Sequence, residues 1–147
     1  MIVTKRATPD DATECAGILQ EWINETSWFT SPHPASAAAP ILRRNIKEHG
    51  FTLAIIDSQI AGFSCMSDGV LDFLYVRRQF RNRSVGKMLL NRCKFACPAG
   101  FALWTFQQNN GARRFYEREG FVEVERTDGA GNEEGLPDIR YIWEGRK

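Results

Sequence analysis

Segments with the two-residue alternation of β-strands and segments with the periodicity of amphipathic helices follow one another along this chain. The expected order is a strand, two helices, three strands, a helix, a strand, a helix and two strands. A turn around Asp57, Ser58 and Gln59 joins two of these strands as a hairpin, and helices separate most of the others. This order predicts an α/β fold (α+β) with a mixed sheet and helices on its faces.

The bounds of these elements follow from local signals. Thr8 is expected to cap the first helix, with Pro9 in its first turn, and Gly50 to end the second. The expected strands cover residues 2–6, 51–57, 60–68, 69–76, 101–107, 121–127 and 138–143. The remaining helices are expected over 36–49, from about 84 to 97, and over 109–119.

Composition limits the class of protein. The 147 residues, 43% hydrophobic and 25% charged, predict one domain over 1–147. A net charge of +1 argues against a nucleic-acid-binding protein. No segment reaches the roughly 18 apolar residues of a membrane span, and the N-terminus lacks a signal peptide, so a cytoplasmic protein without membrane contact is expected.

Cysteine and histidine do not form a metal-binding pattern, so no metal is expected. Cysteines 93 and 97 lie one helical turn apart, and all four are expected to be reduced. These residues are Cys15, Cys65, Cys93, Cys97, His33 and His49.

Positive charge is concentrated where an expected strand gives way to a helix. The stretch QFRNRSVGKMLL (79–90) places Arg81, Arg83 and Lys87 around a Ser-Val-Gly sequence. The first amides of a helix have no acceptor within the helix and attract anions, which favours an anion site. A solvated turn would carry the same charges. A Walker A loop is excluded because Met88 stands where Ser or Thr should follow the lysine.

Two motifs resemble the GNAT acetyltransferase superfamily. Arg81-x-x-Ser84-x-Gly86 is similar to its acyl-CoA pyrophosphate loop, Q/R-x-x-G-x-G/A, with Ser84 in place of the first glycine. A serine keeps the backbone N–H and is a good N-cap, but its Cβ would limit the approach of a pyrophosphate. NNGARRFYEREGF (109–121) is similar to the family's N-x-x-A-x-x-x-Y-x-x-x-G-F helix. The chain is identified as a member over essentially its whole length.

The resemblance implies a GNAT-like fold, a twisted mixed sheet of about seven strands flanked by about four helices. Its central parallel strands, here 69–76 and 101–107, would splay apart to admit the pantetheine arm of acetyl-CoA, the implied cosubstrate. A homodimer is the family default. The residues that the resemblance assigns to cosubstrate binding are Leu74, Tyr75, Val76, Arg81, Asn82, Arg83, Ser84, Val85, Gly86, Lys87, Asn109, Ala112, Phe115 and Tyr116.

Catalysis is less completely specified. Asn109, Ala112 and Tyr116 share one helix face, and the resemblance makes Tyr116 the acid that protonates the departing thiolate. Packing in the core would explain the same aromatic residue. Asp72 and His33 are the candidates for the base, although a solvated Asp and a turn His are the plainer interpretations.

The acceptor is expected to be a primary amine of a small or amino-acid-like molecule. The loop 128–138, which carries Glu133 and Glu134, would border its site together with the loop 26–35. The acidic residues would attract a cationic acceptor, and a solvated hairpin loop would also explain them. Two alternatives remain: a protein or peptide N-acetyltransferase, and a non-catalytic acyl-CoA-binding domain.

Overall fold

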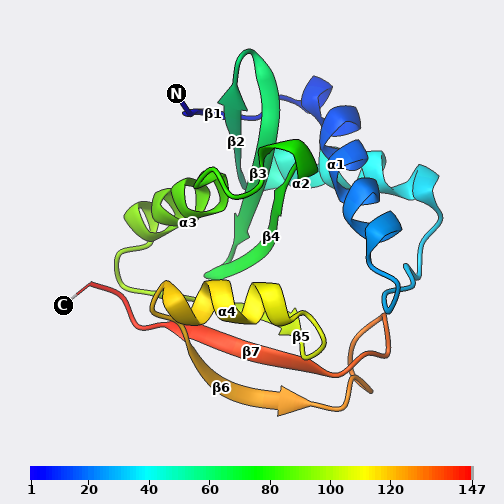
Figure 1. The fold of residues 1–147 in the computed structure, drawn as a ribbon, viewed down its shortest axis with the longest axis vertical. Coiled ribbons are helices and arrows are strands. Elements are labelled where there is room, and N and C mark those ends of the chain that lie inside the picture. The colour runs from blue at the N-terminus through cyan, green and yellow to red at the C-terminus, as the bar shows by residue number, and fades with distance from the viewer. Residues whose placement is uncertain (147) are drawn as a thin grey trace.

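The computed structural model describes residues 1–146 as one seven-stranded mixed sheet with four α-helices (Figure 1). Three short 3₁₀ turns lie at Pro9–Asp11, Ala35–Ala37 and Arg78–Phe80. The elements are β1 (Val3–Arg6), α1 (Ala12–Glu25), α2 (Ala38–Glu48), β2 (Gly50–Ile56), β3 (Gln59–Ser67), β4 (Val70–Val76), α3 (Val85–Ala96), β5 (Phe101–Phe106), α4 (Asn110–Arg118), β6 (Val122–Thr127) and β7 (Asp138–Trp143). The predicted order of strands and helices is confirmed.

The sheet order is β1-β2-β3-β4-β5-β7-β6, and β4 and β5 form its parallel pair. A β-bulge lies in β4, because Met66 of β3 pairs with Leu71 while Cys65 pairs with Phe73, which leaves Asp72 without a partner. A bulge bends its strand and increases the local twist. The bulge therefore deflects β4 at the middle of the sheet.

Helices cover both faces of the sheet. α1 and α2 pack on one face against Phe51, Leu53 and Phe63, and α3 packs on the other face of the same strands. In Figure 1, α3 lies beside β2–β4 on the side away from α1, and α4 lies along β5 and β7. Tyr116 of α4 shares a core cluster with Tyr141 of β7. The sheet therefore has two halves with separate apolar clusters.

Local signals explain most element boundaries. Thr8 is the N-cap of the 3₁₀ turn Pro9–Asp11, which leads into α1, and its N–H donates to the Asp11 carboxylate at 2.8 Å; Asp11 and not Thr8 is the N-cap of α1 itself. Asp57 and Ser58 have positive φ values of 49° and 64°, as a tight hairpin turn requires. Gly50 differs from its prediction: it begins β2 and has no left-handed φ.

All four cysteines are free thiols, and three of them are buried. Within residues 1–146, none of the helices combines the length and the apolar character that crossing a membrane requires.

Candidate active site

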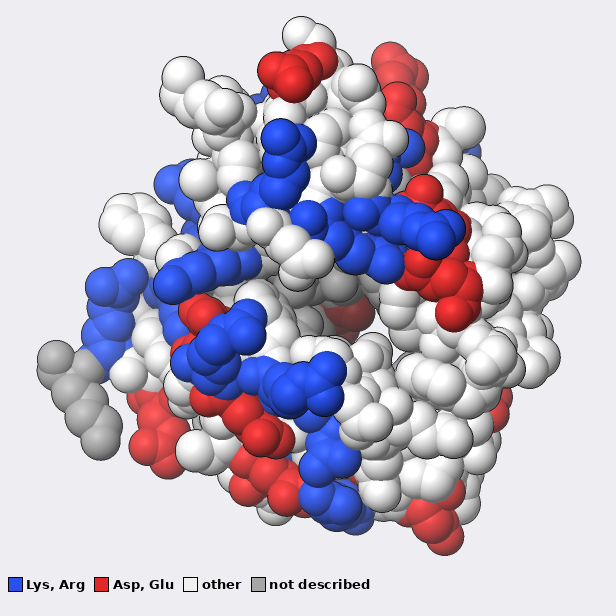
Figure 2. Space-filling model, viewed as in Figure 1, with Lys and Arg blue, Asp and Glu red and all other residues white. Residues whose placement is uncertain are grey.

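The two central strands separate to form a cleft. β4 and β5 stay paired only as far as Leu71 and Leu103. Beyond these residues lies a cavity of about 1200 Å³, lined by β4, the turn before α3, β5 and α4. Figure 2 shows a hollow here, with Lys and Arg side chains gathered above and below it. We call this cavity the cleft. It opens directly beyond the bulge in β4.

One edge of β4 faces the cleft without a strand partner. The Arg77 N–H donates to the Ala61 carbonyl at 2.7 Å, and hydrogen-bonded positions alternate along an antiparallel pair. The backbone groups of Leu74 and Val76 therefore point away from β3. The Val76 carbonyl accepts a bond from Arg81 Nε at 3.4 Å. An extended ligand could add to this edge as a further strand would.

The turn over residues 81–87 exposes backbone amides to the cleft. Asn82 and Ser84 both have left-handed backbones, with φ values of 63° and 64°. Ser84 occupies the N-cap position of α3, but its side chain makes no capping hydrogen bond. Ser84 was expected to cap α3 with its hydroxyl, and this expectation is wrong. A serine that caps a helix usually has an extended backbone, whereas the backbone of Ser84 is left-handed. The first amides of α3 are thus left for an external acceptor.

Gly86 stands where α3 approaches α4. A Cβ at this position would lie 3.5 Å from Phe115 Cζ and 3.8 Å from Val76 Cγ2, which is ordinary contact. Alanine therefore fits, as the family motif allows. A longer side chain would extend into the cleft, because Gly86, Phe115 and Val76 all line it.

Cations flank the cleft on two sides. Arg81 and Lys87 line it near the start of α3, and Arg114 and Arg118 of α4 line it from the other side. Arg114 and Arg118 were not predicted. Their spacing of four residues, which places them on one helix face, was the available signal.

The arginines of the turn differ in their surroundings. The Arg81 guanidinium pairs with the Glu25 carboxylate at the end of α1. Arg83 lies outside the residues that line the cleft and packs over the Phe80 ring at 5.8 Å. Arg81 therefore faces the cleft with part of its charge balanced, whereas Arg83 does not line the cleft.

The expected ligand-facing residues of α4 line the cleft together. Asn109 is the N-cap of α4, and its Oδ1 accepts the Ala112 N–H at 3.1 Å. This oxygen is engaged in the cap, which leaves the side-chain amide NH₂ as the group that Asn109 could offer a ligand. Ala112, Phe115 and Tyr116 continue along the same cavity wall.

Tyr116 is 8% exposed and packs against Phe121 at 5.5 Å and Phe115 at 5.1 Å. Burial is the main cause that raises the pKa of Tyr116 above its ordinary value, and the nearby Tyr75 phenol contributes. The phenol therefore keeps its proton at neutral pH. Tyr116 is therefore packed in the core and also lies at the cavity wall, so packing does not exclude the predicted role at the ligand.

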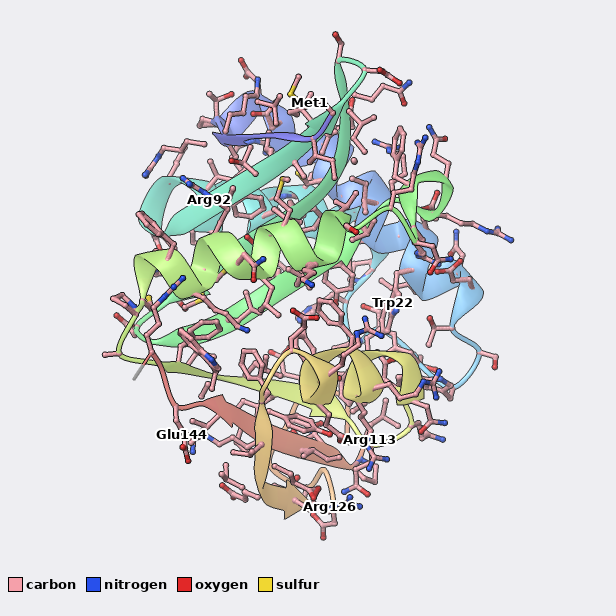
Figure 3. The ribbon with its side chains drawn as sticks, turned by 60° about the vertical axis from the view of Figure 1, so that its left-hand side comes forward. Met1, Trp22, Arg92, Arg113, Arg126 and Glu144 are labelled. Atoms are coloured by element: carbon pink, nitrogen blue, oxygen red, sulfur yellow. The ribbon has the colours of Figure 1, made fainter. Side chains whose placement is uncertain are left out.

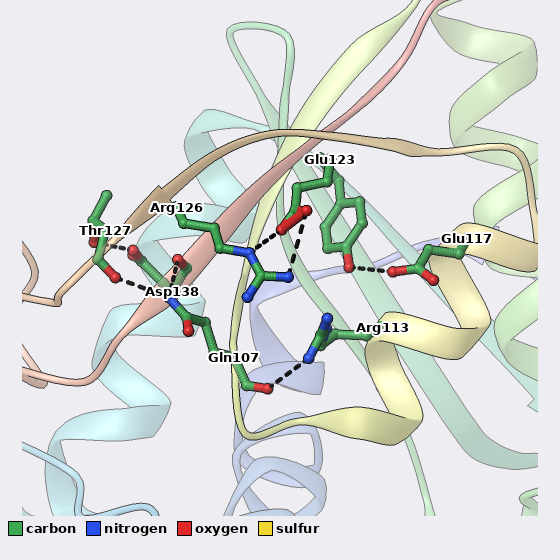
Figure 4. Close-up of polar contacts among 8 residues, drawn as sticks. Gln107, Arg113, Glu117, Glu123, Arg126, Thr127 and Asp138 are labelled. Atoms are coloured by element: carbon green, nitrogen blue, oxygen red, sulfur yellow. Dashed lines mark hydrogen bonds and ion pairs between the residues drawn. The ribbon is translucent and has the colours of Figure 1, made fainter.

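Hydrogen bonds fix α4 on the sheet (Figure 4). The Tyr141 hydroxyl of β7 donates to Glu117 Oε2 at 2.6 Å. Arg113 Nη1 donates to the Gln107 carbonyl, just after β5, at 3.2 Å. These contacts hold the helix that carries Tyr116 in one position relative to β5 and β7.

The two candidate bases lie in different places. Asp72, at the bulge, lines the cleft and accepts a hydrogen bond from the Ser67 hydroxyl. His33 does not line the cleft, and its Nε2 lies 3.1 Å from Glu133 Oε2. That pair joins the loop 26–35 to the loop 128–138, which lie side by side in Figure 1. The structure therefore supports Asp72 as a cleft residue and His33 as a loop contact.

Aromatic rings cross the opening between β4 and β5 on the α1 side. Trp22 lies 5.6 Å from Tyr75 and 5.0 Å from Phe29, and Phe29 lies 5.6 Å from Phe106 at the end of β5. Figure 3 places Trp22 at the space between α1 and α4. Trp22 is half-buried and lines the cleft. Burial, and secondarily the Glu134 carboxylate, raise the pKa of Tyr75 to about 12.

Comparison with known proteins agrees with this geometry. Residues 47–123, just over half of the chain, match the family model described as an acetyltransferase (GNAT) domain. The match includes β4, the turn 81–87 and α4. No curated protein matches the sequence.

Solved structures share the fold over nearly the whole chain. The apo-form of YjaB from Escherichia coli is 20% identical, with a TM-score of 0.81 and 99% of each chain covered. Ard1 from Thermoplasma volcanium is 19% identical, with a TM-score of 0.79 and 99% of each chain covered. The PaiA N-acetyltransferase from Thermoplasma acidophilum, solved in complex with coenzyme A, is 21% identical, with a TM-score of 0.78 and 98% of this chain and 99% of that chain covered.

At these identities the structural likeness shows the fold, and the family follows from the sequence match. The matched segment carries the splayed strands, the amide-rich turn and the helix with Tyr116. The chain belongs to the GNAT family and is a GNAT-type acetyltransferase.

Proposed function

We propose that the protein transfers an acetyl group from acetyl-CoA to a primary amine of a small molecule. The observation that carries this proposal is the cleft itself. A free strand edge, a turn of exposed amides and a buried phenol line one cavity between β4 and β5. Each of these three features matches one part of an acyl-CoA: its amide-containing arm, its phosphates and its sulfur.

The residues of the cleft fit acetyl-CoA. The backbone of Leu74 and Val76 would bond the pantetheine arm, and the amides of the turn 81–87 would hold the pyrophosphate. Lys87 and Arg114 would add charge-assisted contacts to phosphate oxygens. Bound acetyl-CoA supplies an acetyl thioester whose carbonyl carbon accepts a nucleophile.

Tyr116 is the proposed general acid. Its raised pKa keeps the hydroxyl proton in place, ready to be donated to the sulfur as the carbon–sulfur bond breaks. The position of the phenol on the wall of the cleft disfavours a purely non-catalytic acyl-CoA-binding domain.

Asp72 is the proposed acceptor of the proton that the amine must lose. It lies where β4 and β5 part, and the Ser67 hydroxyl orients its carboxylate. A carboxylate at this place can take the proton from an incoming ammonium directly or through water. His33 is not part of this proposal, because it does not line the cleft.

Two measurements on the purified chain test the proposal. Calorimetry should show CoA binding, and thiol release from acetyl-CoA should appear with small primary amines in a panel of amines, amino acids and peptides. Turnover of peptides with no activity on any small amine would favour a protein or peptide acetyltransferase. CoA binding without thiol release for any acceptor would favour a binding domain.

A further inference from the structure

A second cavity lies beneath the β6–β7 loop. Its volume is about 480 Å³, and it shares Trp104, Thr105 and Phe106 of β5 with the cleft. This volume falls within the roughly 300–1,000 Å³ of small-molecule sites. Leu103 packs toward α4, so alternation along β5 directs Trp104 and Phe106 to the opposite face. We call this second space the acidic cavity, because Glu134 and Asp138 line it.

In the described part of the chain, both charged side chains that line this cavity are carboxylates, those of Glu134 and Asp138. Asp138 is only 9% exposed. Its oxygens accept bonds from two neutral donors, the Thr127 hydroxyl (Figure 4) and Asn132 Nδ2, the latter at 3.1 Å. A buried carboxylate whose partners are neutral leaves a negative potential in the space beside it.

Aromatic rings complete the walls. Trp104 keeps 43% of its surface exposed, which is high for a large aromatic side chain at a cavity wall. Phe106 lies next to Asp138 in the register of β5 and β7. Carboxylates combined with exposed aromatic faces attract organic cations, the rings through cation–π contacts. The chemistry of the cavity therefore fits an alkylammonium group.

The acidic cavity and the cleft adjoin along β5, where Trp104, Thr105 and Phe106 line both. Glu134 lines the cavity, and its carboxylate contributes, after burial, to the raised pKa of the Tyr75 phenol in the cleft. The amine that reacts must reach the cleft and lose its charge there. The carboxylates of the neighbouring cavity are therefore available to bind a different cationic group of the same molecule.

We propose that the acidic cavity binds a second ammonium group of the acceptor, so that the substrate is a diamine. This inference rests on the acetyl transfer proposed above. The competing group is Arg140, which stands opposite Trp104 on β7 but does not line the cavity. If the positive charge of Arg140 outweighed the carboxylates of the cavity, the site would prefer an amine that carries a carboxylate over one that carries a second ammonium group.

Three four-carbon amines separate these possibilities: n-butylamine, putrescine and γ-aminobutyrate. Each is titrated calorimetrically into the full chain, with and without CoA. Putrescine should bind about tenfold or more tightly than n-butylamine, as expected for a charge-assisted bond. Equal affinity of these two amines, or tightest binding of γ-aminobutyrate, would overturn the proposal.

Three variants test which residues give putrescine its higher affinity. Glu134→Gln should remove the advantage of putrescine over n-butylamine. Glu133→Gln should keep it, because Glu133 pairs with His33 and does not line the cavity. Trp104→Leu should weaken putrescine binding by about 2- to 30-fold if its ring contacts the cation. A putrescine advantage that survives in Glu134→Gln would contradict this assignment.

The CoA titration and the thiol-release assay distinguish failure of the proposed acetyl transfer from failure of the proposed diamine specificity. Normal CoA affinity with equal acetylation of n-butylamine and putrescine would refute the diamine inference and leave the proposed transfer intact. Absence of both CoA binding and thiol release would refute the proposed transfer. In that case the amine titrations without CoA still decide whether the cavity binds a diamine.

Discussion

The cleft and the acidic cavity share three residues of β5 but differ in the charges that line them. The cleft carries cations from the 81–87 turn and from α4 together with the carboxylates of Glu25, Asp72 and Glu119, whereas the charged residues that line the cavity are Glu134 and Asp138. Arg81 and Lys87 lie within seven positions of each other, so one short segment brings them together. Phe106, Thr127 and Asp138 come from three strands that meet only in the folded sheet.

This difference shows two ways of building a site. The anion site uses backbone amides and nearby side chains of one turn, so its chemistry depends little on distant parts of the chain. The acidic cavity needs the β5–β7 and β6–β7 pairings to place its walls. Changes in the turn should therefore affect CoA alone, and changes in the cavity should affect the acceptor alone.

The largest expected effect comes from Gly86→Glu. The new carboxylate would enter the cleft beside the amides of the turn and repel phosphate, which should weaken CoA binding by at least about 100-fold. Calorimetry measures the affinity, and circular dichroism checks the fold. Gly86→Ala is the matched control, because its Cβ would make only ordinary contacts with Phe115 and Val76. Equal CoA affinity in Gly86→Glu would show that the phosphates bind elsewhere.

Tyr116→Phe should lower kcat by on the order of 10²-fold and leave CoA affinity nearly intact. The ring and its packing remain, and only the proton is lost. Tyr75→Phe is the control, since this phenol lines the same cleft from β4. A larger loss in Tyr75→Phe than in Tyr116→Phe would assign the acid role to Tyr75.

The pH dependence of the wild type adds a second test of Tyr116. Burial raises its pKa above the ordinary value of 10.0, so the phenol should stay protonated through pH 10. We therefore expect that ionisation of Tyr116 does not lower kcat below pH 10. If the wild type loses kcat in this range, Tyr116→Phe should lose it in the same way. A decline that Tyr116→Phe abolishes would indicate an exposed phenol with an ordinary pKa.

Lys87→Gln and Arg114→Gln should each weaken CoA binding by about 3- to 10-fold, with a smaller effect at high salt. Arg83→Gln should change the affinity by less than about twofold, because Arg83 lies outside the cleft lining. Titrations at two ionic strengths measure these effects. A larger loss in Arg83→Gln than in the other two would reverse the assignment of the cations.

The smallest expected effect is on stability. Ser84→Gly removes a left-handed serine, whose strain exceeds the entropic cost of glycine by about 0.5 kcal/mol. Thermal unfolding should show a Tm higher by about 1–2 °C. Asn82→Gly should gain less, because Asn tolerates this backbone better. A lower Tm for Ser84→Gly would mean that the serine side chain stabilises the turn.

Local patterns predicted the strands, the helices and most residues of the cleft, because turns, caps and helix faces depend on neighbours in sequence. Ser84 was predicted as an ordinary cap, yet its left-handed backbone follows from the path between β4 and α3. Arg81 was predicted as a phosphate ligand, yet it also pairs with Glu25 from α1, far away in sequence. Sequence spacing carries no information on such partners.

The sequence by itself determined the family, the order of elements and the turn that we propose to bind anions, since each depends on residues within one or two helical turns of one another. Only the tertiary structure decided which surface we propose for the acceptor. The bulge at Asp72 opens the sheet, and the strand pairings bring Trp104, Glu134 and Asp138 to one cavity. A cavity is the space between elements, and its walls exist only once long-range packing has fixed the positions of those elements.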